Sequence, residues 1–207
     1  DVGADSSFYT NFHGEVHYFE PLESSNIFRA ERALNQGHDI LRNKKSYFNN
    51  FGLSTTTDKK KLITWEAGDV IPNPHGDDVY LGGNNYMETM RGDDYITSNK
   101  LLPPDFVSID TEGHELDVVR GFGDYLSQIK VIQFEYGGTW YSAGIKMQEM
   151  LNLLRKNNFR AFAYINMKPP NGLVPLNWTT DKQDHYAYCN VVCINSTEKE
   201  LLWGLKM

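Results

Sequence analysis

Short apolar runs alternate along the chain with stretches in which apolar residues recur at helical spacing. The run Phe106–Ile109 has the length and composition of a buried strand, and Leu116, Val119 and Phe122 then repeat at the spacing of a helix face. Another short apolar run follows at residues 131–134. This succession predicts a strand, a helix and a second strand, which is the repeating unit of a parallel α/β sheet.

The same alternation extends to both sides of this unit. An apolar run ends at Glu20, after which Ser24 or Ser25 can cap a helix that extends toward Leu41. Residues 68–85 are rich in Gly, Asn and Pro and are predicted to form a loop or lid. We predict two short strands around this loop, at residues 62–65 and 86–90. An amphipathic helix at residues 145–154 and two final strands, at 159–165 and 186–194, follow.

These elements fit a single α/β domain that covers residues 1–207. A chain of 207 residues with 40% hydrophobic content can bury a sizeable core. A doubly wound domain needs an apolar strand before its first turn, yet Asp1 already stands where that strand would end. We therefore expect the first strand to be truncated at Asp1 and the domain to belong to a longer polypeptide with other domains.

Charge and cysteine content narrow the class of protein. The formal net charge of -7 and the lack of a long basic run argue against a nucleic-acid partner. No apolar run approaches the roughly 18 residues that a membrane span needs. Cys189 and Cys193 would lie roughly 13 Å apart in an extended strand at about 3.3 Å per residue, too far for a disulfide. Buried free thiols suit a reducing compartment, so the sequence predicts a cytoplasmic protein.

Residues 105–115 bring several carboxylates and a histidine into one short segment. Asp110 ends the apolar strand, at the edge where open α/β sheets bind their ligands. Glu112, His114 and Glu115 are predicted to open the following helix. Carboxylates in a first helical turn can also simply complement the helix dipole, and this structural role is an alternative for Glu112 and Glu115.

The first residues of the chain have the spacing of a nucleotide site. Gly3 stands in the first turn, and Glu20 closes the next strand 19 positions after Asp1. Asp5 would repel a pyrophosphate at this turn, but it tolerates a ligand with an adenosine, a cationic sulfonium and an amino acid. S-adenosylmethionine has this composition.

Six segments, in their order along the chain, resemble the FkbM-type family of S-adenosylmethionine-dependent methyltransferases. Residues 1–4 resemble its first loop, residues 19–21 its ribose-binding segment, and residues 51–54 the end of its third strand, near the adenine. Residues 90–96 resemble an element ahead of the fourth strand, residues 109–121 the family's most recognisable block, and residues 134–135 the end of the fifth strand.

The resemblance implies a Rossmann-like, doubly wound, mostly parallel sheet with a last antiparallel strand. It also implies S-adenosylmethionine as the cofactor, contacted by Asp1, Gly3, Asp5, Glu20 and Asp110. Asp5 and Ser7 depart from the family pattern, which has a small amide residue and a further glycine at these positions.

Methyl transfer to an oxygen requires a group that removes the proton of the acceptor, although positioning dominates the rate. Asp110 is the first candidate for this base, followed by His114 and Glu112. Alternatively, Asp110 and Glu135 ligate a hard divalent cation, since both supply oxygen ligands. The sequence leaves both roles open.

Polar and aromatic residues late in the chain are candidate contacts for a sugar or glycan acceptor. Glu135, Tyr136 and Trp140 lie at or after the predicted carboxyl end of a strand, where aromatic faces can stack on a sugar ring. His185 follows a polar loop that leads into the last predicted strand. Trp140 could equally fill the core, and His185 could equally be a structural histidine.

The sequence therefore predicts an O-methyltransferase that acts on a hydroxyl of a sugar or glycan. One alternative is a glycoside hydrolase in which Asp110 works with Glu112 or Glu135. Another is a catalytically silent module that keeps the methyltransferase fold, which the departures at Asp5 and Ser7 motivate.

Overall fold

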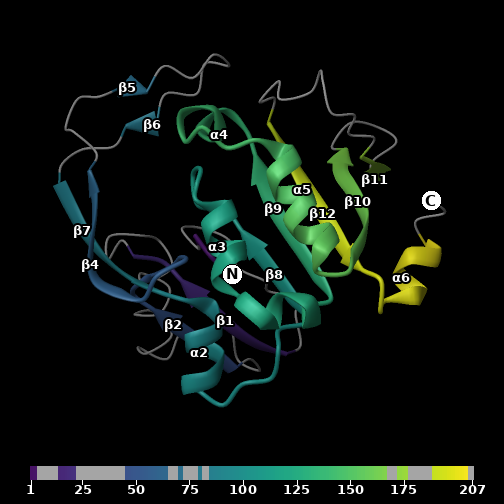
Figure 1. Ribbon diagram of the computed structural model, residues 1–207, viewed down its shortest axis with the longest axis horizontal. Helices are drawn as coiled ribbons and strands as arrows, with labels where there is room; N and C mark the ends of the chain where they lie inside the picture. The colour runs from purple at the N-terminus through teal and green to yellow at the C-terminus, as the bar shows by residue number, and fades with distance from the viewer. Residues whose placement is uncertain are drawn as a thin grey trace, which may run out of the picture.

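The computed structural model describes residues 1–3, 14–21, 45–64, 70–71, 79–80, 84–166, 172–176 and 188–204 (Figure 1). The helix predicted after Ser24 or Ser25, and the candidate site residues Asp5 and His185, lie outside these ranges.

A mixed five-stranded sheet forms the centre of the fold. It has the order β11-β10-β12-β9-β8, made of Gly172–Pro175, Phe159–Asn166, Cys189–Asn195, Val131–Tyr136 and Phe106–Ile109. β8 and β9 pair in parallel, whereas β12 pairs antiparallel with both β9 and β10. The expected antiparallel last strand is therefore confirmed, and it lies between two strands that run in the opposite direction.

Val2 joins this sheet to a second pair of parallel strands. β1 (Glu15–Phe19) pairs in parallel with β2 (Lys45–Asn49), and Val2 forms parallel bridges to Phe19 on one side and to Ile109 on the other. The amide of Val2 donates to the Ser108 carbonyl, and the Val2 carbonyl accepts from the Asp110 amide, both at 2.9 Å. The carboxyl ends of β1 and β8 thus meet at one edge, on either side of Val2.

Three further strands form a smaller sheet in the order β3-β7-β4, which comprises Gly52–Leu53, Asn84–Met90 and Asp58–Thr64. The strands predicted at 62–65 and 86–90 are confirmed, although both begin earlier. The segment predicted as a loop contains a short hairpin, β5 (Val70–Ile71) and β6 (Val79–Tyr80). Residues 51–54 do not end the strand beside β1, because β2 ends at Asn49 and β3 pairs with β7.

The described helices are short. They are α2 (Gly92–Ser98), α3 (Glu115–Gly121), the 3-10 helix η2 (Gly123–Gln128), α4 (Gly138–Ser142), α5 (Met147–Lys156) and α6 (Lys199–Gly204). In Figure 1, α3 lies in front of β8 and α5 in front of β12 and β10. The predicted apolar face of α5 is buried, with Met147, Met150, Leu151 and Leu154 fully covered. No helix in the described part of the chain is long and apolar enough to cross a membrane.

One hydrophobic core connects the central sheet to these helices. Phe134 of β9 and Leu151 of α5 are fully buried, as is Val119 of α3. Cys189 and Cys193 are free thiols on β12, as their spacing predicted. The core therefore fixes β8 and β9 side by side, and the candidate site lies where these two strands end.

Candidate active site

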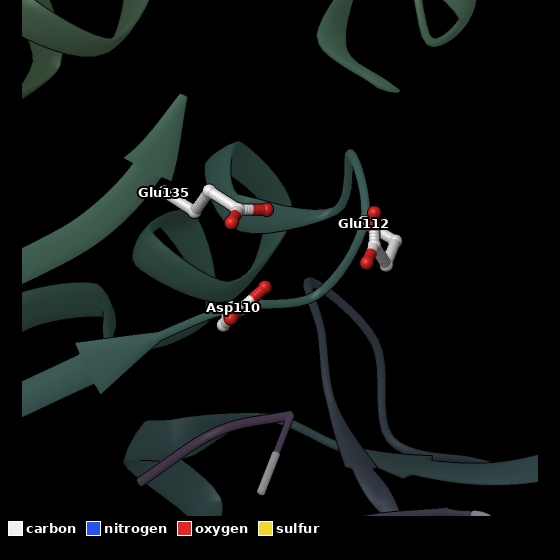
Figure 2. Close-up of side chains that lie close together, drawn as sticks. All are labelled: Asp110, Glu112 and Glu135. Atoms are coloured by element: carbon white, nitrogen blue, oxygen red, sulfur yellow. The ribbon is translucent and has the colours of Figure 1, made fainter. Parts of the chain in front are cut away.

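Three carboxyl groups meet at the carboxyl ends of β8 and β9 (Figure 2). Oxygen atoms of Asp110, Glu112 and Glu135 all lie within 4.8 Å of one another. The parallel register aligns Ile109 with Phe134, so the next residues along the two strands, Asp110 and Glu135, come to lie opposite each other. Glu112 approaches them from the turn that follows Asp110. The sheet register and one turn therefore gather residues that lie 25 positions apart in the sequence.

The turn after Asp110 has an unusual backbone. Glu112 and Gly113 have positive φ angles of 52° and 97°, a conformation that residues with a side chain rarely adopt. α3 consequently begins at Glu115, with His114 at its N-cap, and not at Glu112 as predicted. The extra turn directs Glu112 back toward Asp110 and Glu135.

The Glu135 carboxyl has a raised pKa. Partial burial, the negative charge of Asp110 and then that of Glu112 raise its pKa to about 8, and a hydrogen bond from the Tyr188 hydroxyl opposes this shift. At neutral pH the Glu135 carboxyl therefore keeps its proton. The hydrogen bond between Glu135 and Asp110 favours the protonated form of Glu135 and relieves repulsion inside the cluster.

The opening turn of the chain lies directly against Asp110. Gly3 has φ +77°, and a Cβ atom at this position would stand 1.6 Å from the Asp110 carbonyl oxygen. The Gly3 amide also donates to the Phe19 carbonyl at 2.9 Å. Only glycine fits between these two strand ends, so the turn, the end of β1 and Asp110 share one edge.

Glu20 follows β1 at this same edge. It is a buried acid at 6% exposure, and the Asn50 side chain donates to the carbonyls of Glu20 and Pro21 at 3.2 Å. The Asp1 carboxylate is also close, and its Oδ2 atom is buried with no hydrogen-bond partner among the residues that the structure describes. Carboxylate acceptors beside a glycine turn suit a ligand with hydroxyl and ammonium donors.

A cavity of about 460 Å³ lies at the other end of these strands. Its lining includes Glu15 and His17 of β1, Leu101 in the segment before β8, and Phe106 at the start of β8. The acidic cluster takes no part in its lining. This cavity is therefore separate from Asp110, Glu112 and Glu135, although Asp1 and Val2 also line it.

The matched region of a family model covers this whole edge. The model of the methyltransferase FkbM domain matches residues 1–161, which include Gly3, Glu20, Asp110 and Glu135. The chain belongs to the FkbM methyltransferase family.

One curated relative extends this finding. Over 104 residues the FkbM-family chain is 27% identical to the hexuronic acid methyltransferase AglP of Haloferax volcanii, and the match covers 50% of this chain and 40% of AglP. The chain thus spans less than half of the length of that relative. No solved structure matches the chain.

Two of the expected acceptor contacts in this FkbM-family chain are core residues. Trp140 and Tyr136 are both fully buried, and the Trp140 ring stacks on Phe134 with its centroid 5.5 Å away. Their faces are covered by protein, so in this structure Trp140 has the core role that the sequence left open, and neither ring is presented to a sugar. His114 stands at the N-cap position of α3, without a side-chain capping hydrogen bond, and is not part of the group formed by Asp110, Glu112 and Glu135.

Tyr188 is an aromatic side chain at the site that the sequence interpretation missed. It is 65% exposed and shares a hydrogen bond with Glu135. The antiparallel pairing of Cys189 with Tyr136 and of Asn190 with Glu135 brings it to the cluster. The sequence places Tyr188 inside the strand predicted at 186–194, whereas β12 begins at Cys189, so Tyr188 lies just ahead of the strand.

Proposed function

We propose that this chain is an S-adenosylmethionine-dependent O-methyltransferase that acts on a hydroxyl of a sugar or glycan. Family membership supports methyl transfer, and the convergence of Gly3, Glu20 and Asp110 at one sheet edge is the observation that carries the proposal. A Rossmann-like, doubly wound sheet, which is part of this proposal, would bind its ligand at this edge. The relative that is named for hexuronic acid supports a sugar acceptor.

The residues at this edge fit the proposed cofactor. S-adenosylmethionine supplies a methyl group activated by a positively charged sulfur. Gly3 allows close approach to the backbone, Glu20 would accept hydrogen bonds from ribose hydroxyls, and the buried Asp1 Oδ2 offers an acceptor for the amino group. The acidic character of the edge also suits a cationic ligand.

Asp110 is the proposed base. Its carboxylate lies exposed at the end of β8 and would accept the proton of an acceptor hydroxyl. Protonated Glu135 beside it donates its hydrogen bond to Asp110, and Tyr188 provides an exposed ring for the apolar face of a sugar. A modest base suffices, because positioning contributes effective molarities of about 10⁵ to 10⁸ M.

A divalent cation is the alternative role for the acidic cluster. Oxygen atoms from Asp110, Glu112 and Glu135 within 4.8 Å of one another suit a hard cation such as Mg²⁺ or Ca²⁺. A cation would displace the proton of Glu135 and polarise the acceptor hydroxyl. Both roles use Asp110 and differ in their response to a chelator.

Family membership disfavours the glycoside hydrolase alternative. An assay of methyl transfer tests the other alternative, a catalytically silent module. Tritiated methyl groups should pass from S-adenosylmethionine to a member of a glycan panel. Binding of S-adenosylmethionine without transfer to any glycan would contradict the proposed acceptor class.

Replacement of Glu20 tests the cofactor site. We expect Glu20→Ala to weaken S-adenosylmethionine binding by about 1–3 kcal/mol, because ribose hydroxyls would lose a charged acceptor. Isothermal titration calorimetry measures this loss. Glu15→Ala, at the opposite end of β1, is the matched control and should bind normally. Unchanged affinity in the Glu20 variant would mean that the adenosine lies elsewhere.

A further inference from the structure

Glu115 is a buried acid whose carboxylate turns back onto the preceding turn. The residue is only 1% exposed. Oε1 accepts hydrogen bonds from the Thr111 amide at 2.9 Å and the Thr111 hydroxyl at 3.1 Å, and Oε2 accepts from the Gly113 amide at 3.1 Å. An exposed first-turn carboxylate that only complements a helix dipole would need none of these contacts.

The fold keeps an acid here although burial opposes its charge. Burial raises the pKa of Glu115 to about 7, and the hydrogen bonds from Thr111 and Gly113 oppose this shift. A buried apolar side chain would fill the same space without a desolvation penalty. The specific contribution of the carboxylate is therefore the set of donors that it collects.

Those donors lie on both sides of Glu112. Thr111 and Gly113 flank it, so the Glu115 carboxylate ties together the two ends of a turn whose middle residue has a strained φ of 52°. Gly113 has no freedom to move outward, because even a Cβ atom there would stand 2.9 Å from the Thr139 carbonyl oxygen. The turn is fixed from inside by Glu115 and from outside by α4.

Such a restraint is needed because the side chains that this turn carries repel one another. Asp110 and Glu112 bring their carboxylates within 4.8 Å of each other and of Glu135. Like charges at this distance favour separation. Without a tie across the turn, Glu112 could relax to an ordinary backbone conformation and leave the cluster.

From these contacts we infer that Glu115 is a positioning residue, whose carboxylate holds the turn of residues 110–114 so that Asp110 and Glu112 face Glu135. This inference rests on the proposed function for its effect on the rate, but the geometric restraint exists whatever reaction the site performs. Glu115 itself does not touch the substrate in this assignment. It acts through Thr111 and Gly113.

Glu115→Gln is the main test. The amide keeps the shape of the side chain but directs an NH₂ group at backbone N–H donors, so the turn loses part of its tie. We expect kcat to fall by about 10²-fold, as for a small misplacement of reacting groups, with the KM for S-adenosylmethionine changed by less than about twofold. Asp117→Asn, an acid in the same helix that pairs with Arg120, is the matched control and should keep both constants.

A second readout separates positioning from general destabilisation. In chelator-treated protein, the carboxyl signal of Glu135 followed by NMR should titrate near pH 8 in the wild type. In Glu115→Gln this pKa should fall by part of the shift, because the repulsion from Asp110 and Glu112 weakens while the burial of Glu135, the largest cause, remains. The Asp117 control should titrate like the wild type.

The outcomes are distinct. A folded Glu115→Gln protein with wild-type kcat and wild-type titration of Glu135 would overturn the inference. If Glu115→Gln does not fold, Thr111→Val decides, since it removes only the hydroxyl bond and should lower kcat by about fivefold with a smaller shift of the Glu135 pKa in the same direction. A wild type without methyl transfer would refute the proposed function, while the titration would still test the restraint.

Discussion

Asp110→Asn should lower the turnover number by at least about tenfold while the protein remains folded. The amide has nearly the shape of the carboxylate but cannot accept a proton or ligate a cation strongly. Because Asp110 is exposed at the end of β8 and lies outside the hydrophobic core, its replacement should leave the thermal midpoint almost unchanged. Single-turnover methyl transfer and a thermal melt measure the two quantities.

Asp105→Asn is the matched control for this experiment. Asp105 is an exposed acid just before the opposite end of β8, where it pairs with Lys130. Its replacement should leave turnover intact. Wild-type rates in the Asp110 variant would refute its assignment both as base and as ligand.

A chelator divides the two roles of Asp110. If Asp110 is the base, wild-type turnover should be the same before and after treatment with EDTA. If it ligates a cation, EDTA should abolish turnover and added Mg²⁺ should restore it. In the second case the Asp110 variant should also lose affinity for the cation.

Gly3→Ala should have the other large effect, on stability and on the cofactor site together. The positive φ of Gly3 alone costs a residue with a side chain about 1–3 kcal/mol. The Asp110 carbonyl, 1.6 Å from the position of the new Cβ, must also move. Because that carbonyl belongs to the backbone that carries Asp110, both S-adenosylmethionine affinity and turnover should fall.

Gly144 offers a control with the same backbone strain and no clash. It has φ +68°, and a Cβ atom there would meet nothing within 4 Å. Urea denaturation should therefore show a smaller loss in the free energy of unfolding for Gly144→Ala than for Gly3→Ala. Equal losses in the two variants would contradict the close packing of the first turn on Asp110.

The strands at the centre of the site could be predicted because their signals are local. Residues 106–109 form a short apolar run that ends at an acid, and the strand is observed with these bounds. Residues 131–134 form a similar apolar run that ends at Glu135, so the sequence predicts both Asp110 and Glu135 as acids at strand ends. Their contact depends on parallel pairing in one register, which the α/β pattern implied.

The role of Glu115 could not be predicted, because an acid in a first helical turn has the same sequence pattern whether it faces solvent or the core. Glu112 has a positive φ, so α3 begins only at Glu115, whose side chain is buried. Trp140 and Tyr188 show the same limit for aromatic residues. Burial of Trp140 against Phe134 and exposure of Tyr188 beside Glu135 both follow from tertiary packing.

A crystal structure with bound S-adenosylhomocysteine tests the central claim most directly. We predict that the ribose lies within hydrogen-bond distance of Glu20, that the chain of the ligand passes over Gly3, and that its sulfur faces the Asp110 carboxylate. A ligand seated instead in the cavity at the amino ends of β1 and β8, or with its sulfur directed away from Asp110, would contradict the account.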